Sequence, residues 1–318
     1  MRELFERGGV LLDGGLGSML IAAGLQAGSP PEEWNHTNRD VIMTVHASYL
    51  AAGSDVISTN TFGATPARLE GHGLGDQLRS INTAGVRLAR DAVARFRGGR
   101  ADKNQRRDSG NEAADARFVA LSIGPTGKML PPVGAASEDE VKAEFTGQFR
   151  SIEDDFDFVL IETIFDLREG LLALEAAKDT FPYPVAVSLT YNTNPRGFFT
   201  VMGDEAGAAV KQLQAAGADV VGANCSISSG DMLALADVLR RNTDLPILCQ
   251  PNAGNPTVEN RVPVYKQRPE EFAGDAMKLF EKGINAVGGC CGTTPDFIRE
   301  VSARLRPGRP KPEGAAGS

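Results

Sequence analysis

Three cysteines have the residue types and the settings of a metal site. Cys225 lies in the run GANCS, and Cys290 and Cys291 are adjacent in the run GGCCGTTP. Adjacent cysteines make poor disulfide partners because the ring that would join them is strained. Three thiolates bind Zn²⁺ well and leave its fourth tetrahedral position open, as in catalytic zinc sites. We therefore expect one Zn²⁺ per chain, with a substrate thiol as the fourth ligand; the alternative is three buried cysteines that act as small hydrophobic residues.

The composition is that of a globular protein without a nucleic-acid surface. The chain has 318 residues, 42% of them hydrophobic and 23% charged, and its net charge of −8 disfavours a nucleic-acid partner. No apolar run approaches the ~18 residues of a membrane span, and the first fifteen residues contain no apolar segment of a signal peptide. Four cysteines in a chain of this length do not form a secreted disulfide framework. We expect a cytoplasmic location and no membrane partner.

A repeated pattern predicts the architecture that must position these cysteines. A helical stretch ends in Gly and is followed by a run rich in Val and Ile, as at 51–59, 215–224 and 281–289. Helical patterns, such as those at 41–52, 140–154 and 269–282, lie between most of the predicted strands. Eight β-then-α units indicate a single-domain α/β fold, the (β/α)8 TIM barrel. A doubly wound open sheet is the second choice, but no G-x-G-x-x-G run follows the first strand. The predicted strands are 10–13, 56–60, 118–123, 158–162, 185–190, 220–224, 247–250 and 286–288.

Two polar segments interrupt this pattern without marking a domain boundary. Residues 97–117 are charged and contain no large apolar side chain, which predicts a flexible insertion before the third strand. Residues 307–318 are rich in Pro and Gly, which predicts a disordered tail. The barrel is therefore expected to occupy residues 1–306.

Two carboxylates stand where barrel enzymes carry functional residues, at the carboxyl ends of strands. Asp13 precedes Gly14 and Gly15, so it either caps the next helix or faces the barrel mouth beside free backbone N–H groups. The second arrangement suits an α-amino acid, with Asp13 on the ammonium and the glycine N–H groups on the carboxylate. Glu162 ends an apolar strand, where a buried, unpaired carboxylate is costly and needs a polar partner or ligand.

The remaining cysteine and the histidines are expected to lie outside the metal site. Cys249 falls within the seventh predicted strand, which indicates a buried small hydrophobic residue. His36, His46 and His72 fall in helical or loop segments far from the cysteine runs, so solvated or helix-capping roles are predicted for all three.

Taken together, these runs resemble the homocysteine S-methyltransferase family. The likeness is carried by LLDGGLGS, DVISTNTFGAT, SIGPTG, LIET, GANCS, QPNAG and GGCCGTTP, and it extends from about Gly9 to Leu305. It is strongest to the homocysteine-binding barrel of cobalamin-dependent methionine synthase and to bacterial betaine–homocysteine methyltransferases. The resemblance implies a (β/α)8 barrel, a zinc site made by the three cysteines, and homocysteine held by Asp13 and Glu162 on its amino group and by Gly14 and Gly15 on its carboxylate.

The resemblance also implies a transferase reaction that forms methionine, but it leaves the methyl donor open. Gly63 and Thr163 stand where betaine-using relatives of the animal type carry aromatic residues, which favours a methyl-corrinoid on a separate protein or domain. Betaine is the alternative donor. Methyl transfer to another thiol is a further alternative, and a barrel that binds zinc without catalysis is the rival from another class. Two carboxylates at the mouth favour an amino-thiol substrate over mere storage of zinc.

Overall fold

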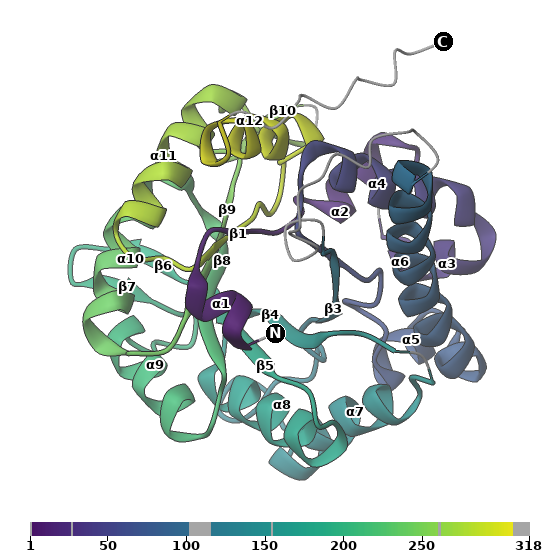
Figure 1. The fold of residues 1–318 in the computed structure, drawn as a ribbon. Helices are drawn as coiled ribbons and strands as arrows, with labels where there is room; N and C mark the ends of the chain where they lie inside the picture. Colours follow the sequence, from purple (N-terminus) through teal and green to yellow (C-terminus); the bar gives the residue numbers. More distant parts are fainter. Residues whose placement is uncertain (1, 27, 102–115, 154, 260–261, 308–318) are drawn as a thin grey trace.

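A sheet of eight parallel strands forms the centre of the structure, a computed structural model that describes residues 2–307 apart from 27, 102–115, 154 and 260–261. The strand order is β1-β12-β9-β8-β5-β4-β3-β2, and the sheet curls into a nearly closed barrel surrounded by helices (Figure 1). The predicted (β/α)8 architecture is confirmed. The barrel strands are β1 (Val10–Leu11), β2 (Val56–Ser58), β3 (Phe118–Ile123), β4 (Phe158–Ile164), β5 (Val185–Leu189), β8 (Val220–Ser228), β9 (Ile247–Asn252) and β12 (Ala286–Val287).

All eight predicted strands exist, but β4, β8 and β9 extend further than the sequence indicated, β9 by the two residues Pro251 and Asn252. β4 runs two residues past Glu162, and β8 runs past Cys225, so both residues lie inside strands. The extensions of β4 and β8 each contain a shift of register, between Ile161 and Ile164 in the β4–β5 pair and between Asn224 and Ser228 in the β8–β9 pair. Such bulges re-aim side chains and are common beside active sites.

Helices cover the outside of the barrel, and two hairpins extend from its strand ends. The hairpins pair β6 (Asn192–Asn194) with β7 (Gly197–Phe199) and β10 (Thr257–Glu259) with β11 (Val262–Val264), and short 3-10 turns span Pro31–Glu33 and Gly75–Gln77. The helices are α1 (Arg2–Arg7), α2 (Leu16–Ala22), α3 (Trp34–Thr37), α4 (Arg39–Ala52), α5 (Pro66–Gly71), α6 (Leu78–Ala101), α7 (Glu138–Arg150), α8 (Leu167–Thr180), α9 (Ala206–Ala215), α10 (Ser229–Asn242), α11 (Pro269–Glu281) and α12 (Pro295–Leu305).

The barrel interior is a packed core whose amino-terminal end is covered by α1. Phe5 of α1 is fully buried and meets Phe158 edge-on, with 5.3 Å between the ring centroids. Both rings belong to a cluster of strand residues that includes Leu12, Leu160 and Leu248. Because the barrel interior is filled by apolar side chains at this end, the candidate site is expected at the opposite, carboxyl end of the strands, as in other barrels of this type.

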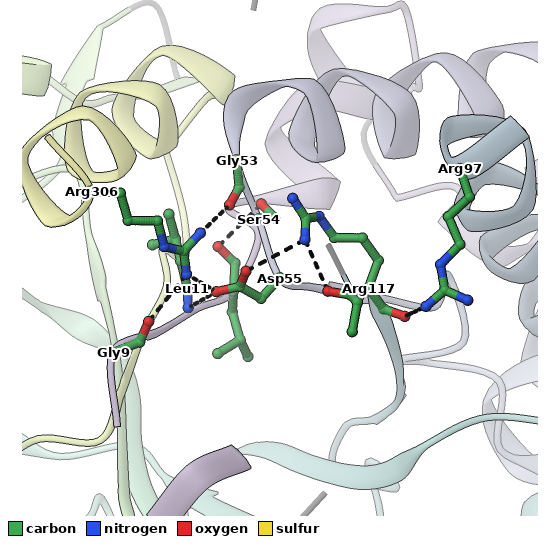
Figure 2. Close-up of polar contacts among 10 residues, drawn as sticks. Gly9, Leu11, Gly53, Ser54, Asp55, Arg97, Arg117 and Arg306 are labelled. Carbon is green, nitrogen blue, oxygen red and sulfur yellow. Dashed lines mark hydrogen bonds and ion pairs between the residues drawn. The ribbon is translucent and has the colours of Figure 1, made fainter. Parts of the chain in front are cut away.

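The two edge strands of the sheet, β1 and β2, are joined at the amino-terminal end by Asp55. Its backbone N–H donates to the carbonyl of Leu11 at 2.7 Å, and its carboxylate accepts the Leu11 N–H at 3.0 Å. Figure 2 shows this carboxylate between two guanidinium groups, those of Arg306, which donates to it, and Arg117, 3.8 Å away. A buried carboxylate needs such partners, and here its hydrogen bonds close the barrel seam.

The predicted insertion at 97–117 is shorter in the structure. Residues 97–101 form the end of α6, and Arg117 is buried with its backbone carbonyl accepting a hydrogen bond from Arg97 at 3.1 Å (Figure 2). Residues 102–115, the greater part of the segment, lie outside the described residues, and so does the predicted tail after Pro307. None of the described helices combines the length and the apolar character needed to cross a bilayer.

The prediction for the histidines is wrong at His46. His72 is the C-cap residue of α5 and His36 is exposed, as expected, but His46 on α4 is fully buried. Neither of its ring nitrogens has a hydrogen-bond partner among the described residues. Burial without a partner disfavours the charged form and lowers the pKa of His46 from 6.5 to about 4.

His46 should make the folded state sensitive to acid. In the unfolded chain His46 is protonated near its ordinary pKa of 6.5, whereas in the folded chain it is protonated only near its lowered pKa of about 4. Stability from this group is therefore complete above pH 6.5 and is lost as the pH falls toward 4. Between pH 7 and pH 5 the loss is about 2 kcal/mol. Urea unfolding at both pH values should show a smaller loss for His46→Leu than for the wild type.

The matched control is His36→Gln, which changes an exposed histidine and should keep the wild-type response. An acid response of His46→Leu equal to that of the wild type would show that other groups cause it.

Candidate metal and substrate site

The structure brings the three predicted cysteines together at the carboxyl end of the barrel. Cys225 lies near the end of β8, while Cys290 and Cys291 follow β12, and β9 separates these two strands in the sheet. The sulfur of Cys291 lies 3.9 Å from that of Cys225 and 3.9 Å from that of Cys290. All three sulfurs lie within 4.8 Å of one another, and each residue is partly accessible.

The spacing of these sulfurs fits a soft tetrahedral metal ion. A disulfide needs sulfurs about 2.05 Å apart, so the cluster is a set of free thiols. A tetrahedral ion with Zn–S bonds of about 2.3 Å places its sulfur ligands about 3.8 Å apart. The arrangement is thus preformed for Zn²⁺ or a metal of similar preference. Cys249, in contrast, is fully buried in β9, where burial raises the pKa of its thiol to about 12.

The thiols of the cluster titrate together. Hydrogen bonds from Cys225 and Cys290 favour the thiolate of Cys291 and lower its pKa. The same contacts, with burial, raise the pKa of Cys290. Ionisation of one thiol is therefore favoured, and its negative charge disfavours ionisation of the other two. A bound cation would offset this repulsion.

Hydrogen bonds to β9 hold the loop that carries two of the cysteines. The Cys290 N–H donates to the carbonyl of Pro251 at 2.9 Å, and the Cys291 N–H donates to Oδ1 of Asn252 at 3.1 Å. The Ala253 N–H donates back to the carbonyl of Cys291 at 3.0 Å. This anchoring fixes the two sulfurs relative to the barrel before any ligand binds.

A second set of contacts joins the same loop to the segment after β1. The Gly292 N–H donates to Oγ of Ser18 at 2.9 Å, and the Gly15 N–H donates to Oγ1 of Thr293 at 2.9 Å. A Cβ at Gly15 would lie 2.5 Å from the carbonyl oxygen of Cys290, so only glycine fits there. The Gly15 N–H that the resemblance assigned to a substrate carboxylate thus already donates to Thr293.

Asp13 lies in the barrel mouth and also joins β1 to β2. Its carboxylate accepts the Ser58 N–H at 2.7 Å and the Ser58 hydroxyl at 3.0 Å. These bonds favour the charged form, but burial outweighs them and raises the pKa of Asp13 to about 6. Asp13 therefore has a structural contact that the sequence did not indicate, in addition to its predicted place at the mouth.

Glu162 lies on β4 beside Asp13 and the cysteines. It accepts a hydrogen bond from the Ser122 hydroxyl at 2.6 Å. Burial, together with the negative charges of Asp13 and Cys225, raises the pKa of Glu162 to about 7. Within the described part of the chain, no basic side chain lies within ion-pair distance of Asp13 or Glu162. Two carboxylates without a cation, each with a raised pKa, are suited to receive an ammonium group.

Sequence reasoning missed several residues around the site. Tyr265 follows β11 and its ring contacts Gly292, where a Cβ would lie 2.3 Å from the ring. Burial and the neighbouring thiol of Cys291 raise its pKa. Asn224 and Thr163 are hydrogen-bonded to each other between the cysteine cluster and Glu162. Their position directly beside Cys225 and Glu162 in the sequence was the available signal.

The fold and this thiol cluster together define a (β/α)8 barrel with a preformed soft-metal site at its mouth. The chain belongs to the homocysteine S-methyltransferase family, whose model matches residues 10–305. It is 32% identical over 279 residues to the methionine synthase of Mycobacterium leprae (strain TN), covering 85% of this chain and 22% of that protein. It is 31% identical over 309 residues to the methionine synthase of Mycobacterium tuberculosis (strain ATCC 25618 / H37Rv), covering 92% of this chain and 24% of that protein.

The chain therefore spans about a quarter of the length of these curated relatives. Among solved structures, the metallated form of the homocysteine methyltransferase MmuM from Escherichia coli has the same fold. The TM-score is 0.75 at 24% sequence identity, over 93% of this chain and 96% of that chain.

We expect the three cysteines to hold zinc, so replacing any one of them by alanine should remove most of it. Loss of an outer hydrogen-bond partner alone costs a metal site about 10- to 100-fold in affinity, and loss of a ligand should cost more. Metal analysis of purified Cys225→Ala, Cys290→Ala and Cys291→Ala proteins measures this effect. Cys249→Ala is the matched control and should keep its zinc. Normal zinc content in the Cys290→Ala protein would contradict the assignment.

Proposed function

We propose that this protein is a zinc-dependent homocysteine S-methyltransferase that forms methionine. The observation that carries the proposal is the three-thiol cluster placed beside two carboxylates that have no basic partner among the described residues. A thiol-binding metal site and an ammonium site side by side match the two ends of an amino-thiol. A barrel that only stored zinc would have no need of the carboxylates.

Cys225, Cys290 and Cys291 are the residues that would hold one Zn²⁺ per chain. Zinc bound there supplies Lewis acidity that lowers the pKa of a substrate thiol from about 8.5, so that the thiolate prevails at neutral pH. The protein's part is to hold three sulfurs in place, and the bound cation would favour the ionised form of all three. Their negative charge keeps electron density on a neighbouring sulfur, which favours its attack on an activated methyl group.

Asp13 and Glu162 would bind the amino group of homocysteine, and the backbone at Gly14 would lie near its carboxylate. Both carboxylates have raised pKa values because they are buried, and the Glu162 pKa is raised further by the charge of Asp13. An ammonium group placed between them offsets this repulsion and favours ionisation of both. The amino acid is thereby oriented with its thiol toward the cysteines, which reduces the entropy lost in the reaction.

The proposed methyl donor is a methyl-corrinoid carried by a separate protein or domain. A quaternary ammonium donor such as betaine binds best in an aromatic cage. The ring of Phe62 is covered by Gly124, where a Cβ would lie 2.5 Å from the ring, and Trp34 packs against the outer core. Gly63 and Thr163, which directly follow Phe62 and Glu162, add no aromatic ring to such a cage. The resemblance of the sequence motifs to the homocysteine-binding barrel of cobalamin-dependent methionine synthase favours the same choice.

A cytoplasmic location is part of the proposal. Free thiols in a cluster with 3.9 Å between sulfurs need a reducing compartment to stay available for a metal. The net charge of −8 likewise supports small-molecule and protein partners in preference to nucleic acid.

Glu162→Gln should weaken homocysteine binding while leaving zinc in place. A hydrogen bond to a charged group contributes about 1.5–3 kcal/mol, which corresponds to about 10- to 100-fold in affinity. Calorimetric titration of the zinc-loaded protein with homocysteine measures the change. Glu162 is a better test than Asp13, because Asp13 also joins β1 to β2. Glu175→Gln, on the exposed face of α8, is the control. Equal homocysteine affinity in wild type and Glu162→Gln would assign Glu162 to structure.

The donor can be identified by assaying methionine formation with each candidate separately. Purified protein and homocysteine should yield methionine with methylcobalamin or a methylated corrinoid protein, and not with betaine alone. Efficient turnover with betaine and no corrinoid would refute the donor assignment and leave the zinc and homocysteine assignments standing. Absence of methionine with every donor, together with no homocysteine binding, would refute the proposed function itself.

A further inference from the structure

Asn224, directly before Cys225, connects the two halves of the site through its side chain. Its Oδ1 accepts the backbone N–H of Thr163 at 2.8 Å and the hydroxyl of Ser188 at 2.9 Å. Its Nδ2 donates to Oγ1 of Thr163 at 2.7 Å and lies 4.0 Å from the sulfur of Cys290. A backbone N–H can only donate, so the amide orientation is fixed by the network itself. Asn224 is 1% exposed, and both polar atoms of its side chain have hydrogen-bond partners.

The segments that Asn224 contacts are conformationally strained. Thr163 has φ of 61°, Cys225 has φ of 61° and Ser226 has φ of 55°. Among the described residues, these are the non-glycine residues with positive φ, and all three adjoin the site. A β-branched residue such as Thr163 is a genuine outlier in this region and persists only where its surroundings hold it.

The strain coincides with the two bulges of the barrel. The register shifts between Ile161 and Ile164 on β4 and between Asn224 and Ser228 on β8. β5, which carries Ser188, lies between these strands in the sheet. Asn224 thus reaches across β5 and ties the bulge that carries Glu162 to the bulge that carries Cys225.

We propose that Asn224 is a positioning residue. It fixes the metal half of the site, the three cysteines, relative to the ammonium half, which contains Glu162. This inference rests on the proposed function for its homocysteine half. By holding Thr163 at positive φ, Asn224 aims Glu162 into the barrel mouth. By its place before Cys225 and its contact with Cys290, it fixes two of the three sulfurs. The distance between the thiol and the ammonium of the bound substrate is thereby set by one buried amide.

Asn224→Ala should therefore weaken both zinc binding and homocysteine binding. The cysteine variants are expected to affect zinc, and Glu162→Gln is expected to affect homocysteine alone. Zinc affinity, measured by competition with a chromophoric chelator, should fall about 10-fold or more. Homocysteine affinity of the zinc-saturated protein should fall about 10- to 100-fold, with KM rising more than kcat falls. Asn82→Ala removes another buried, hydrogen-bonded amide, on α6 and outside this network, and is the matched control, with both affinities near those of the wild type.

A rescue experiment separates positioning from general stabilisation. Glycine adopts positive φ without steric cost, so Thr163→Gly added to Asn224→Ala should restore part of the homocysteine affinity. It should leave zinc affinity low, because the contact with Cys290 is still missing. Equal rescue of both affinities, or wild-type affinity for both ligands in Asn224→Ala, would overturn the proposal.

Milder variants decide the matter if Asn224→Ala does not fold. Thr163→Val keeps the strained, β-branched residue but removes the oxygen that Asn224 holds, so homocysteine affinity should fall. Thr163→Gly relieves the strain and keeps the backbone N–H, so affinity should stay near that of the wild type. A lower homocysteine affinity in Thr163→Gly than in Thr163→Val would refute the inference. The zinc measurements need no homocysteine, so a wild type that bound zinc but not homocysteine would refute the proposed function and leave the metal half of this inference standing.

Discussion

The constraint on which the rest of the site depends is that three thiols are held so close together that ionising more than one of them is costly without a cation. The sulfurs of Cys225, Cys290 and Cys291 lie within 4.8 Å of one another. At an effective dielectric constant near 20, two unit charges about 4 Å apart repel by about 4 kcal/mol. A flexible loop would relieve this repulsion by moving apart. The barrel prevents it, because β9 and the residue after it hold the cysteine loop through two backbone hydrogen bonds and one to the side chain of Asn252, and Cys225 is itself part of β8.

Closure of the barrel serves the same purpose, and two aspartates provide it. Asp55 joins β1 to β2 at the amino-terminal end with the help of Arg306, which comes from the end of α12 (Figure 2). Asp13 joins the same strands at the carboxyl end through Ser58. Since the segment after β1 also binds the cysteine loop, through Ser18, a loose seam would loosen the metal site. Asp13 thus combines a structural contact with its place in the proposed ammonium site.

Among the described residues, the non-glycine residues with positive φ all adjoin the proposed site. Positive φ angles at Thr163 and Cys225 and the bulges in β4 and β8 turn side chains into the mouth that a regular strand would direct elsewhere. Such strain persists only when neighbouring groups hold it. The buried amide of Asn224 is such a neighbouring group, because it forms hydrogen bonds to Thr163 on β4 and to Ser188 on β5.

The sequence by itself predicted the barrel and the three cysteines that the structure brings together. The eight Val- and Ile-rich runs are local patterns, and the spacing of Cys225 from the Cys290–Cys291 pair reflects ligand chemistry that needs no partner from elsewhere in the chain. Only the tertiary structure decided the extent of β4 and β8, the burial of His46, the use of the Gly15 N–H by Thr293, and the bridge from Asn224 to Thr163. These features depend on contacts between residues that are up to 278 positions apart, as for Gly15 and Thr293. A local pattern records which residues suit a strand or a ligand, whereas a hydrogen-bond partner is chosen by the packing of the whole barrel.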